Sequence, residues 1–217
     1  NGLIIIGRLS DEYLDMLEKK SKVPLMYVDF SDNKGVADAV VSDSYYGAYT
    51  ITKYLLEAGH KDIAFVGTVL STSSITDRYL GYTKALMEYG IEIKKDWVID
   101  DRYISTCMID EEKLLQIPEH MPTAFFCNCD LVASMLIKKL ENAGYKIPED
   151  VSVVGYDNFL YPGLCDVEIT TYEVDIKEMA RRAVNNLIKK MSGEKYKHSI
   201  IIVEGHLVEK GSVKNLK

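Results

Sequence analysis

The chain has 217 residues, of which 47% are hydrophobic, and its formal net charge is −7. This length suits one large domain or two small ones, and the hydrophobic content is ample for a buried core. The acidic balance excludes the basic surface that nucleic-acid binding requires, so we expect any DNA-reading part to lie outside these residues. No apolar run approaches the ~20 residues of a membrane-spanning helix.

The cysteine pattern predicts free thiols rather than a metal site. The four cysteines are Cys107, Cys127, Cys129 and Cys165. No Cys-x-x-Cys pair is present, and Cys127-x-Cys129 has no second pair that would complete a zinc site. Such cysteine usage is typical of the reducing cytoplasm. We therefore expect a cytoplasmic protein with no metal and no cofactor.

Along the chain, short apolar runs alternate with helical patterns. The predicted strands are 2–6, 25–28, 36–41, 63–66, 97–99, 123–127, 151–154, 170–172, 200–203 and 206–208. The predicted helices begin near Ser10 and then span 43–57, 77–89, 110–115, 130–143 and 175–191. This alternation predicts an α/β fold with right-handed crossovers. Because no Pro/Gly/Ser-rich linker divides the chain, two lobes would have to be joined by several crossing segments.

The stretch 150–158, Asp-Val-Ser-Val-Val-Gly-Tyr-Asp-Asn, predicts a strand buried on both faces that ends at Gly155. After this glycine come Tyr156, Asp157 and Asn158, one aromatic and two hydrogen-bonding side chains. Ligands of open parallel sheets bind beyond the carboxyl ends of the strands. On this stretch alone, a binding edge and a plain loop with an Asx turn remain open alternatives.

Four predicted strands are followed by a carboxylate, at Asp29, Asp43, Asp130 and Asp157. Because the carboxyl ends of parallel strands meet at one edge, we expect these four side chains to lie along the same edge. For Asp43 and Asp130, the competing role of a helix N-cap is favoured by their position before helical patterns.

Arg78 follows a hydroxyl-rich loop at 67–74 and can reach the same edge. Carboxylates that face an arginine suit a neutral polyol, since the rigid guanidinium fork and the carboxylate both bond vicinal hydroxyls in pairs. Aromatic side chains that can cover a sugar ring or a nucleobase occur at Trp97, Tyr103, Tyr156 and Phe159.

Enzyme motifs are absent from the sequence. It has no GxSxG elbow, HExxH pair, Walker loop or GxGxxG turn. We therefore expect a binding protein without catalytic residues. The rival from the enzyme class is a glycosidase or nucleosidase that uses two of the carboxylates.

Five stretches together carry a resemblance to a known family. They are LEAGHKDIAFVG at 56–67, DRYLGY at 77–82, PTAFF at 122–126, IPEDVSVVGYDN at 147–158 and ITT at 169–171. In this order and spacing the chain resembles the effector-binding core of the lactose-repressor/galactose-repressor (LacI/GalR) family of bacterial transcription regulators. The resemblance covers essentially the whole chain.

The resemblance implies a periplasmic-binding-protein-like fold of type I, in which several crossovers join two parallel-sheet lobes around a small effector, such as a sugar. The first lobe would comprise 1–41 and 174–199, and the second 42–173 and 200–217. It also implies a homodimer that contacts DNA only through an amino-terminal helix-turn-helix. This head, with the opening part of the first lobe, would precede Asn1, so we expect the first lobe to be incomplete.

The resemblance also implies roles for individual residues. Arg78 and Asp157 match positions that bond the effector, and Asp29 matches an acid that faces it from the first lobe. Ser74 and Thr76 lie on the predicted loop just before Arg78.

Three further positions extend this assignment. Tyr103 falls near a position where an aromatic side chain covers the effector. Cys129 and Asp130 stand where the family commonly has Asn-Asp, and a thiol is a poor hydrogen-bond partner. The hydroxyl pattern that is recognised is therefore undecided. A rival with the same fold is an exported sugar-binding protein of a transport system, but the motifs at 59–60 and 148–157 favour the regulator.

Overall fold

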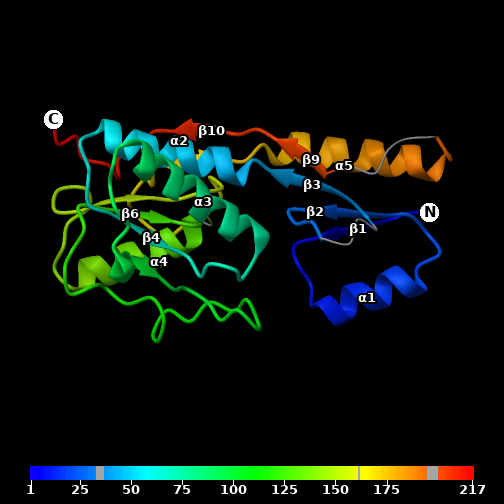
Figure 1. Cartoon of the computed structure of the whole chain (residues 1–217), viewed down its shortest axis with the longest axis horizontal. Coiled ribbons are helices and arrows are strands. Elements are labelled where there is room, and N and C mark those ends of the chain that lie inside the picture. Colours follow the sequence, from blue (N-terminus) through cyan, green and yellow to red (C-terminus); the bar gives the residue numbers. More distant parts are fainter. Residues whose placement is uncertain (33–36, 161, 195–199) are drawn as a thin grey trace. The chain divides into compact units, whose positions relative to one another are not determined.

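The computed structural model describes residues 1–32, 37–160, 162–194 and 200–217. The chain forms two compact units (Figure 1). Unit 1 comprises Asn1–Asp43 and Asp175–Glu204, and unit 2 comprises Ser44–Val174 and Gly205–Lys217. The chain therefore crosses between the units three times, at 43/44, 174/175 and 204/205.

Unit 1 is built on a four-stranded parallel sheet. Its strands are β1 (Leu3–Ile6), β2 (Leu25–Val28), β3 (Asp38–Ser42) and β9 (Ile200–Val203), in the order β1-β2-β3-β9. Two helices, α1 (Asp11–Lys20) and α5 (Ile176–Met191), complete this unit. Each helix begins after a capping side chain, Ser10 or Asp175, which accepts a backbone N–H of the first turn.

The two helices of unit 1 cover opposite faces of its sheet. Leu14 of α1 packs with Tyr27 and Ala39, which share one face. On the other face, the Nζ atom of Lys190 in α5 lies 2.6 Å from the buried carboxylate of Asp38. Figure 1 shows β1, β2 and β3 between α1 and α5.

Unit 2 contains a second four-stranded parallel sheet, in the order β5-β4-β6-β7. Its strands are β4 (Ile63–Val66), β5 (Val98–Ile99), β6 (Ala124–Cys127) and β7 (Ser152–Val154). Its helices are α2 (Ser44–Glu57), α3 (Ser73–Glu88) and α4 (Asp130–Asn142), and a short 3-10 helix, η1 (Lys95–Trp97), precedes β5. An antiparallel pair, β8 (Thr171–Glu173) and β10 (His206–Val208), adjoins two of the crossings.

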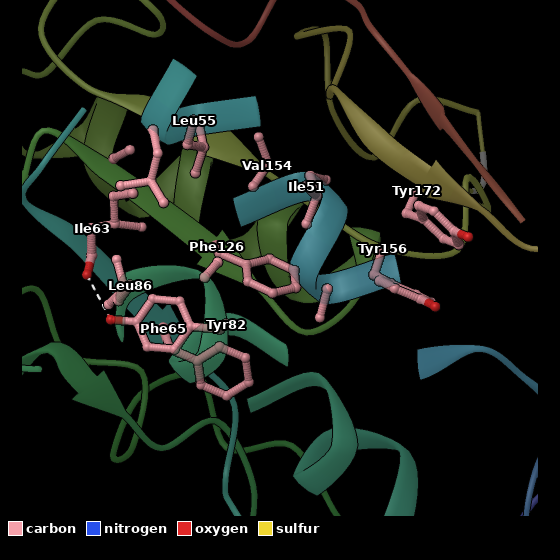
Figure 2. Packing of buried hydrophobic residues seen from close by; sticks show 14 of the residues in the cluster. Ile51, Leu55, Ile63, Phe65, Tyr82, Leu86, Phe126, Val154, Tyr156 and Tyr172 are labelled. Carbon is pink, nitrogen blue, oxygen red and sulfur yellow. Dashed lines mark hydrogen bonds between the residues drawn. The ribbon is translucent and has the colours of Figure 1, made fainter. Parts of the chain in front are cut away.

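The sheet of unit 2 is buried on both faces, as its continuous apolar runs predict. On one face, α2 and α3 pack against Phe65, Phe126 and Val154 (Figure 2). On the other face, α4 packs against Val66 and Phe125. Each fully buried large side chain contributes ~1.5–3 kcal/mol, so this three-layer core holds the strand ends in fixed positions. The α/β fold with parallel sheets predicted from the sequence is confirmed.

Two contacts show how tightly α3 packs in this core. The Tyr82 hydroxyl donates a hydrogen bond to the backbone oxygen of Ile63 at 2.8 Å, drawn as the dashed line in Figure 2. At Gly81, a side chain would overlap the backbone oxygen of Tyr45 in α2. The glycine therefore allows the two helices to approach closely.

The starts of two predicted elements differ from the structure. The helix predicted at 77–89 already begins at Ser73, because the Thr72 hydroxyl accepts the N–H of Ile75 and caps it. The strand predicted at 97–99 lacks Trp97, whose indole N–H donates to the backbone oxygen of His120 at 2.8 Å.

Three further segments complete the comparison. The segment predicted as a helix at 110–115 forms turns only. The resemblance implies that the run 200–203 belongs to the second lobe, but as β9 it pairs in parallel with β3 of unit 1. Val36, the first residue of the strand predicted at 36–41, lies outside the described residues. Residues 195–199, at the end of the predicted first lobe, also lie outside them.

Candidate functional site

Arg78 extends from α3 to the carboxyl-terminal edge of the unit 2 sheet. Its Nη1 atom donates to the backbone oxygen of Asn128, after β6, at 2.6 Å. Its guanidinium lies 3.8 Å from the ring centroid of Tyr156, after β7, an arrangement worth ~2 kcal/mol when desolvated. Its Nη2 atom lies 3.7 Å from Oδ1 of Asp157. The ends of two neighbouring strands thus converge on one buried cation.

Asp157 follows β7 in a backbone conformation that residues other than glycine rarely adopt. Its φ is 104°, and that of Asn158 is 52°. The Asp157 N–H donates to the oxygen of Tyr172 at 2.9 Å, and its oxygen accepts from the N–H of Val174 at 3.3 Å. Such strain persists where the surroundings enforce it, as at ligand sites. The carboxylate remains 32% exposed beside Arg78.

Asn158 ties this turn to β8 and to the carboxyl-terminal segment. Its side-chain amide N–H donates to the carboxylate of Glu173. Its Oδ1 atom accepts from Nζ of Lys210 at 2.7 Å, and its backbone N–H donates to the Thr171 hydroxyl at 3.3 Å. The conformation that presents Asp157 is therefore stabilised from three directions.

A second buried ion pair lies at the same edge, after β4, β5 and β6. Arg102 donates from Nε and Nη2 to Oδ2 of Asp101, at 2.9 and 2.6 Å. Asn128 donates to the same carboxylate oxygen at 2.9 Å, and the N–H of Thr68 donates to Oδ1 at 2.9 Å. Burial opposes ionisation of Asp101, but the bonds and charge of Arg102, with those donors, lower its pKa below the ordinary value.

Asp130 is the first residue of α4, and its backbone N–H donates to the oxygen of Tyr156, after β7, at 2.9 Å. Its carboxylate accepts from the Thr171 hydroxyl at 2.8 Å. Burial raises the pKa of Asp130 to about 6, although this hydrogen bond and the charge of Lys210 act in the opposite direction. Because Asp130 stands inside the helix, it is not the N-cap that its position in the sequence favours.

Cys129 is the N-cap residue of α4, and its side chain makes no capping hydrogen bond. Burial raises the pKa of this thiol to about 11, with a smaller contribution from the charge of Asp157, while the charges of Arg102 and Arg78 lower it. The charges of Asp157, Arg102 and Arg78 therefore all contribute to the pKa of the Cys129 thiol. At neutral pH it is a neutral, weak hydrogen-bonding group.

The four predicted strand-end carboxylates do not share one sheet edge. Asp29 and Asp43 follow β2 and β3 in unit 1, whereas Asp130 and Asp157 follow β6 and β7 in unit 2. The prediction of a common edge is wrong, because two sheets are present where the strand pattern suggested one. Asp29 has a φ of 68°, and its role as an effector contact stays a prediction.

Three other predicted contacts have different surroundings from those expected. Ser74 and Thr76 lie in the first turns of α3 and not on a loop. The Thr76 hydroxyl donates to the oxygen of Thr72 at 2.8 Å. Tyr103 is 40% exposed, and its hydroxyl donates to Asp110 at 2.8 Å. Their roles at the effector stay predictions.

The aromatic side chains proposed as a cover also differ among themselves. Trp97 and Tyr156 are buried in the core, at 5% and 0% exposure, so neither offers a ring face to a ligand. Phe159 is 53% exposed.

Sequence reasoning did not select Asp101, Arg102 or Asn128. The available signal was weak: Asp101 follows β5 as Asp157 follows β7, but it was not distinguished from the exposed Asp100. At the described edge each guanidinium faces a carboxylate, Arg78 with Asp157 and Arg102 with Asp101. The arrangement balances charge and offers donors and acceptors, which suits an uncharged polar ligand.

The described residues, 1–32, 37–160, 162–194 and 200–217, contain no group of three or more His, Cys, Asp or Glu side chains that could hold a metal ion. No helix among them has the length and apolar character that crossing a membrane requires.

Residues 52–213 match the model of the periplasmic binding protein-like domain. The HTH-type transcriptional repressor PurR of Histophilus somni (strain 129Pt) is 29% identical over 214 residues, covering 99% of this chain and 64% of that protein. The chain thus spans about 64% of the length of the curated relatives that it matches.

Two solved structures have similar folds. A putative LacI transcriptional regulator from Bacillus cereus subsp. cytotoxis NVH 391-98 has a TM-score of 0.84 at 22% identity, over 100% of this chain and 77% of that one. A LacI family transcriptional regulator from Enterococcus faecium, solved with bound ribose, has a TM-score of 0.81 at 26% identity, over 100% of this chain and 80% of that one.

Proposed function

We propose that this chain binds a neutral, hydroxyl-rich effector. The premise is that the chain belongs to the family of periplasmic binding protein-like domains and is a ligand-binding domain of the LacI type. The effector binds at the carboxyl-terminal edge of the unit 2 sheet. Its binding controls the attachment of a bacterial transcription regulator to DNA. The chain acts by binding and not by catalysis, and it works in the cytoplasm.

The observation that carries this proposal is the pairing of Arg78 with Asp157. The guanidinium is buried and held by Asn128 and Tyr156, while the Asp157 carboxylate is partly exposed. A vicinal diol can donate to this carboxylate and accept from the guanidinium without leaving either charge unpaired. The Enterococcus faecium regulator was solved with ribose, which supports a sugar of this kind.

The same edge argues against an anionic effector. The two carboxylates Asp101 and Asp157 offset the charges of Arg102 and Arg78. A phosphate or carboxylate ligand would have to displace one of these pairs and leave an acid without its partner, which costs several kcal/mol for a buried group.

DNA contact is assigned to a helix-turn-helix segment outside the 217 residues, since the chain itself carries a net charge of −7. A homodimer is expected because operators of such regulators have two-fold symmetry. Size-exclusion chromatography with light scattering measures this directly, and a monomer at every accessible concentration contradicts the dimer.

The effector must bind two conformations of the regulator unequally, because equal binding shifts no equilibrium. A coupling of roughly 1–3 kcal/mol is ordinary for such systems. The backbone bonds of Asp157 support a route by which effector binding changes the conformation. Asp157 is hydrogen-bonded through its backbone to Tyr172 and Val174, just before the crossing at 174/175. A change at the Asp157 carboxylate therefore acts on a segment that leads into unit 1.

Thermal-shift screening tests the proposal. The panel contains D-ribose, D-xylose, D-glucose, cellobiose and hypoxanthine. A ligand that binds only the folded protein at 100 times its Kd adds about 2.7 kcal/mol of stability. We expect one sugar to raise the melting temperature of the wild type and of the control Arg181→Ala, whose side chain is 62% exposed on α5. Arg78→Ala abolishes this rise. A rise that survives Arg78→Ala overturns the proposed site.

A further inference from the structure

Asn128 connects the two arginines at the edge of the unit 2 sheet. Its backbone oxygen accepts from Nη1 of Arg78 at 2.6 Å. Its side-chain oxygen accepts from Nη2 of Arg102 at 3.1 Å. Its amide nitrogen donates to Oδ2 of Asp101 at 2.9 Å and to the oxygen of Val66 at 3.0 Å. One residue thus bonds both guanidiniums, each through a different group.

Asn128 has little freedom to adopt another orientation. It is 1% exposed, and its side-chain oxygen and nitrogen both have partners. A Cβ atom placed on Gly67 would lie 2.9 Å from the Asn128 Cβ, so the backbone that follows β4 already packs against it. Its backbone N–H also donates to the oxygen of Val66 at 2.8 Å. The position of its backbone oxygen, which receives Arg78, is therefore set by this bond together with the bonds of its side chain.

Arg102 donates the hydrogen bond that the structure shows to the side-chain oxygen of Asn128. Its Nε and Nη2 atoms hold Oδ2 of Asp101, and Nη2 also reaches Asn128. Asp101 is in turn fixed by the N–H of Thr68 at 2.9 Å. The Thr68 hydroxyl accepts the N–H groups of Asp101 and Arg102, at 3.0 Å each. The planar guanidinium bonds Asp101 through two nitrogens while one of them also reaches Asn128, a pattern that the single nitrogen of the shorter lysine side chain does not reproduce.

We propose that Arg102 is a positioning residue of the effector site, which aims the Arg78 guanidinium at the ligand by fixing Asn128 between them. The assignment of a ligand to Arg78 rests on the function proposed above. Arg102 itself contributes no net charge to that ligand, because its charge is offset by the fully buried carboxylate of Asp101. Its contribution is geometric: it holds a pre-formed donor that the ligand need not order on binding.

The test variant is Arg102→Lys. A lysine keeps the charge beside Asp101, so no buried carboxylate loses its counter-ion, but its ammonium cannot bond Asp101 by two nitrogens and also reach Asn128. The matched control is Arg181→Lys, which removes a two-nitrogen arginine–glutamate pair, with Glu178, on the exposed face of α5. If Arg102→Lys fails to fold, the neutral double variant Asp101→Asn, Arg102→Gln carries the same measurements.

The first measurement needs no ligand. In protein labelled with ¹⁵N-arginine, the bond from Arg78 to Asn128 restricts rotation of the guanidinium and gives separate Nη signals. We expect these signals in the wild type and in Arg181→Lys, and a rotation rate about tenfold higher in Arg102→Lys, equivalent to one lost hydrogen bond. An unchanged rotation rate overturns the proposal.

The second measurement is the Kd of D-ribose. With Arg78 unchanged, Arg102→Lys weakens binding about tenfold, equivalent to one hydrogen bond to a charged group. The same change has no effect in an Arg78→Lys background, because its influence passes through Arg78. Equal losses in both backgrounds indicate a merely structural role and overturn the proposal. If the wild type does not bind D-ribose, that ligand fails, and the rotation rate of Arg78 alone decides the positioning role.

Discussion

Replacing Asp130 with asparagine should change how the stability of unit 2 depends on pH. The side chain is 3% exposed, and burial raises its pKa from 3.8 to about 6. A raised pKa means that the folded state holds the proton more tightly than the unfolded state. The resulting stability is fully present below the unfolded pKa of 3.8 and is lost as the pH rises through about 6.

The magnitude follows from the size of this shift. The change from 3.8 to about 6, at about 1.4 kcal/mol per unit, corresponds to about 3 kcal/mol. The Asp130→Asn variant keeps an oxygen that can accept from Thr171 but has no proton to lose. The free energy of unfolding of the variant minus that of the wild type should therefore increase by about 3 kcal/mol as the pH rises from about 4 to about 7.

Urea unfolding followed by tryptophan fluorescence measures this difference for unit 2 specifically. Trp97 is the one tryptophan of the chain, and it is buried in unit 2, so its fluorescence reports the unfolding of that unit. The groups that titrate in both proteins cancel when the two free energies of unfolding are subtracted at each pH. A difference that stays constant across this range would refute a buried, proton-retaining carboxyl at position 130.

Three further changes test the packing and the charges of unit 2. Asp101→Asn should change the pH dependence of stability in the opposite sense to Asp130→Asn. Burial opposes ionisation of Asp101, but the bonds and charge of Arg102 lower its pKa, so the wild type is more stable than the variant above the unfolded pKa and loses this advantage as the pH falls. The same urea titrations measure the difference, and a variant that instead gains stability over the wild type with rising pH contradicts the prediction. Gly155→Ala should cost about 1–3 kcal/mol, because its Cβ would overlap the Asp130 carboxylate; an unchanged melting temperature is the contrary result. Tyr82→Phe should cost about 1 kcal/mol through the lost bond to the Ile63 oxygen, and an unshifted urea midpoint would show that this bond adds nothing.

The meeting of Arg78 and Asp157 could be predicted because it depends on local signals. A glycine ends the strand before Asp157, and the ends of neighbouring parallel strands meet at one edge. The structure places the two side chains 3.7 Å apart. Whether they bind the effector stays a prediction, since this distance describes the protein alone.

The pair of Asp101 and Arg102 could not be predicted, because partner choice in a buried network depends on tertiary packing. A charged pair after a short strand has the same sequence pattern whether it is exposed or, as here, bonded to Asn128. The start of α3 was misplaced for a different reason. Asp77 resembles a first-turn acid, whereas the actual cap is Thr72.

The sheet to which a strand belongs was also beyond local reasoning. The apolar run at 200–203 indicates a strand, but nothing within it indicates a partner. Its pairing with β3 joins segments far apart in the chain. The same uncertainty explains why Asp29 and Asp43 were predicted to share an edge with Asp157.

The most direct measurement is a crystal structure of this chain with the sugar that raises its melting temperature most. We expect sugar hydroxyls within about 3.2 Å of the Arg78 guanidinium and the Asp157 carboxylate. A sugar bound elsewhere on the protein, with both of these side chains unaltered and out of its reach, would contradict it.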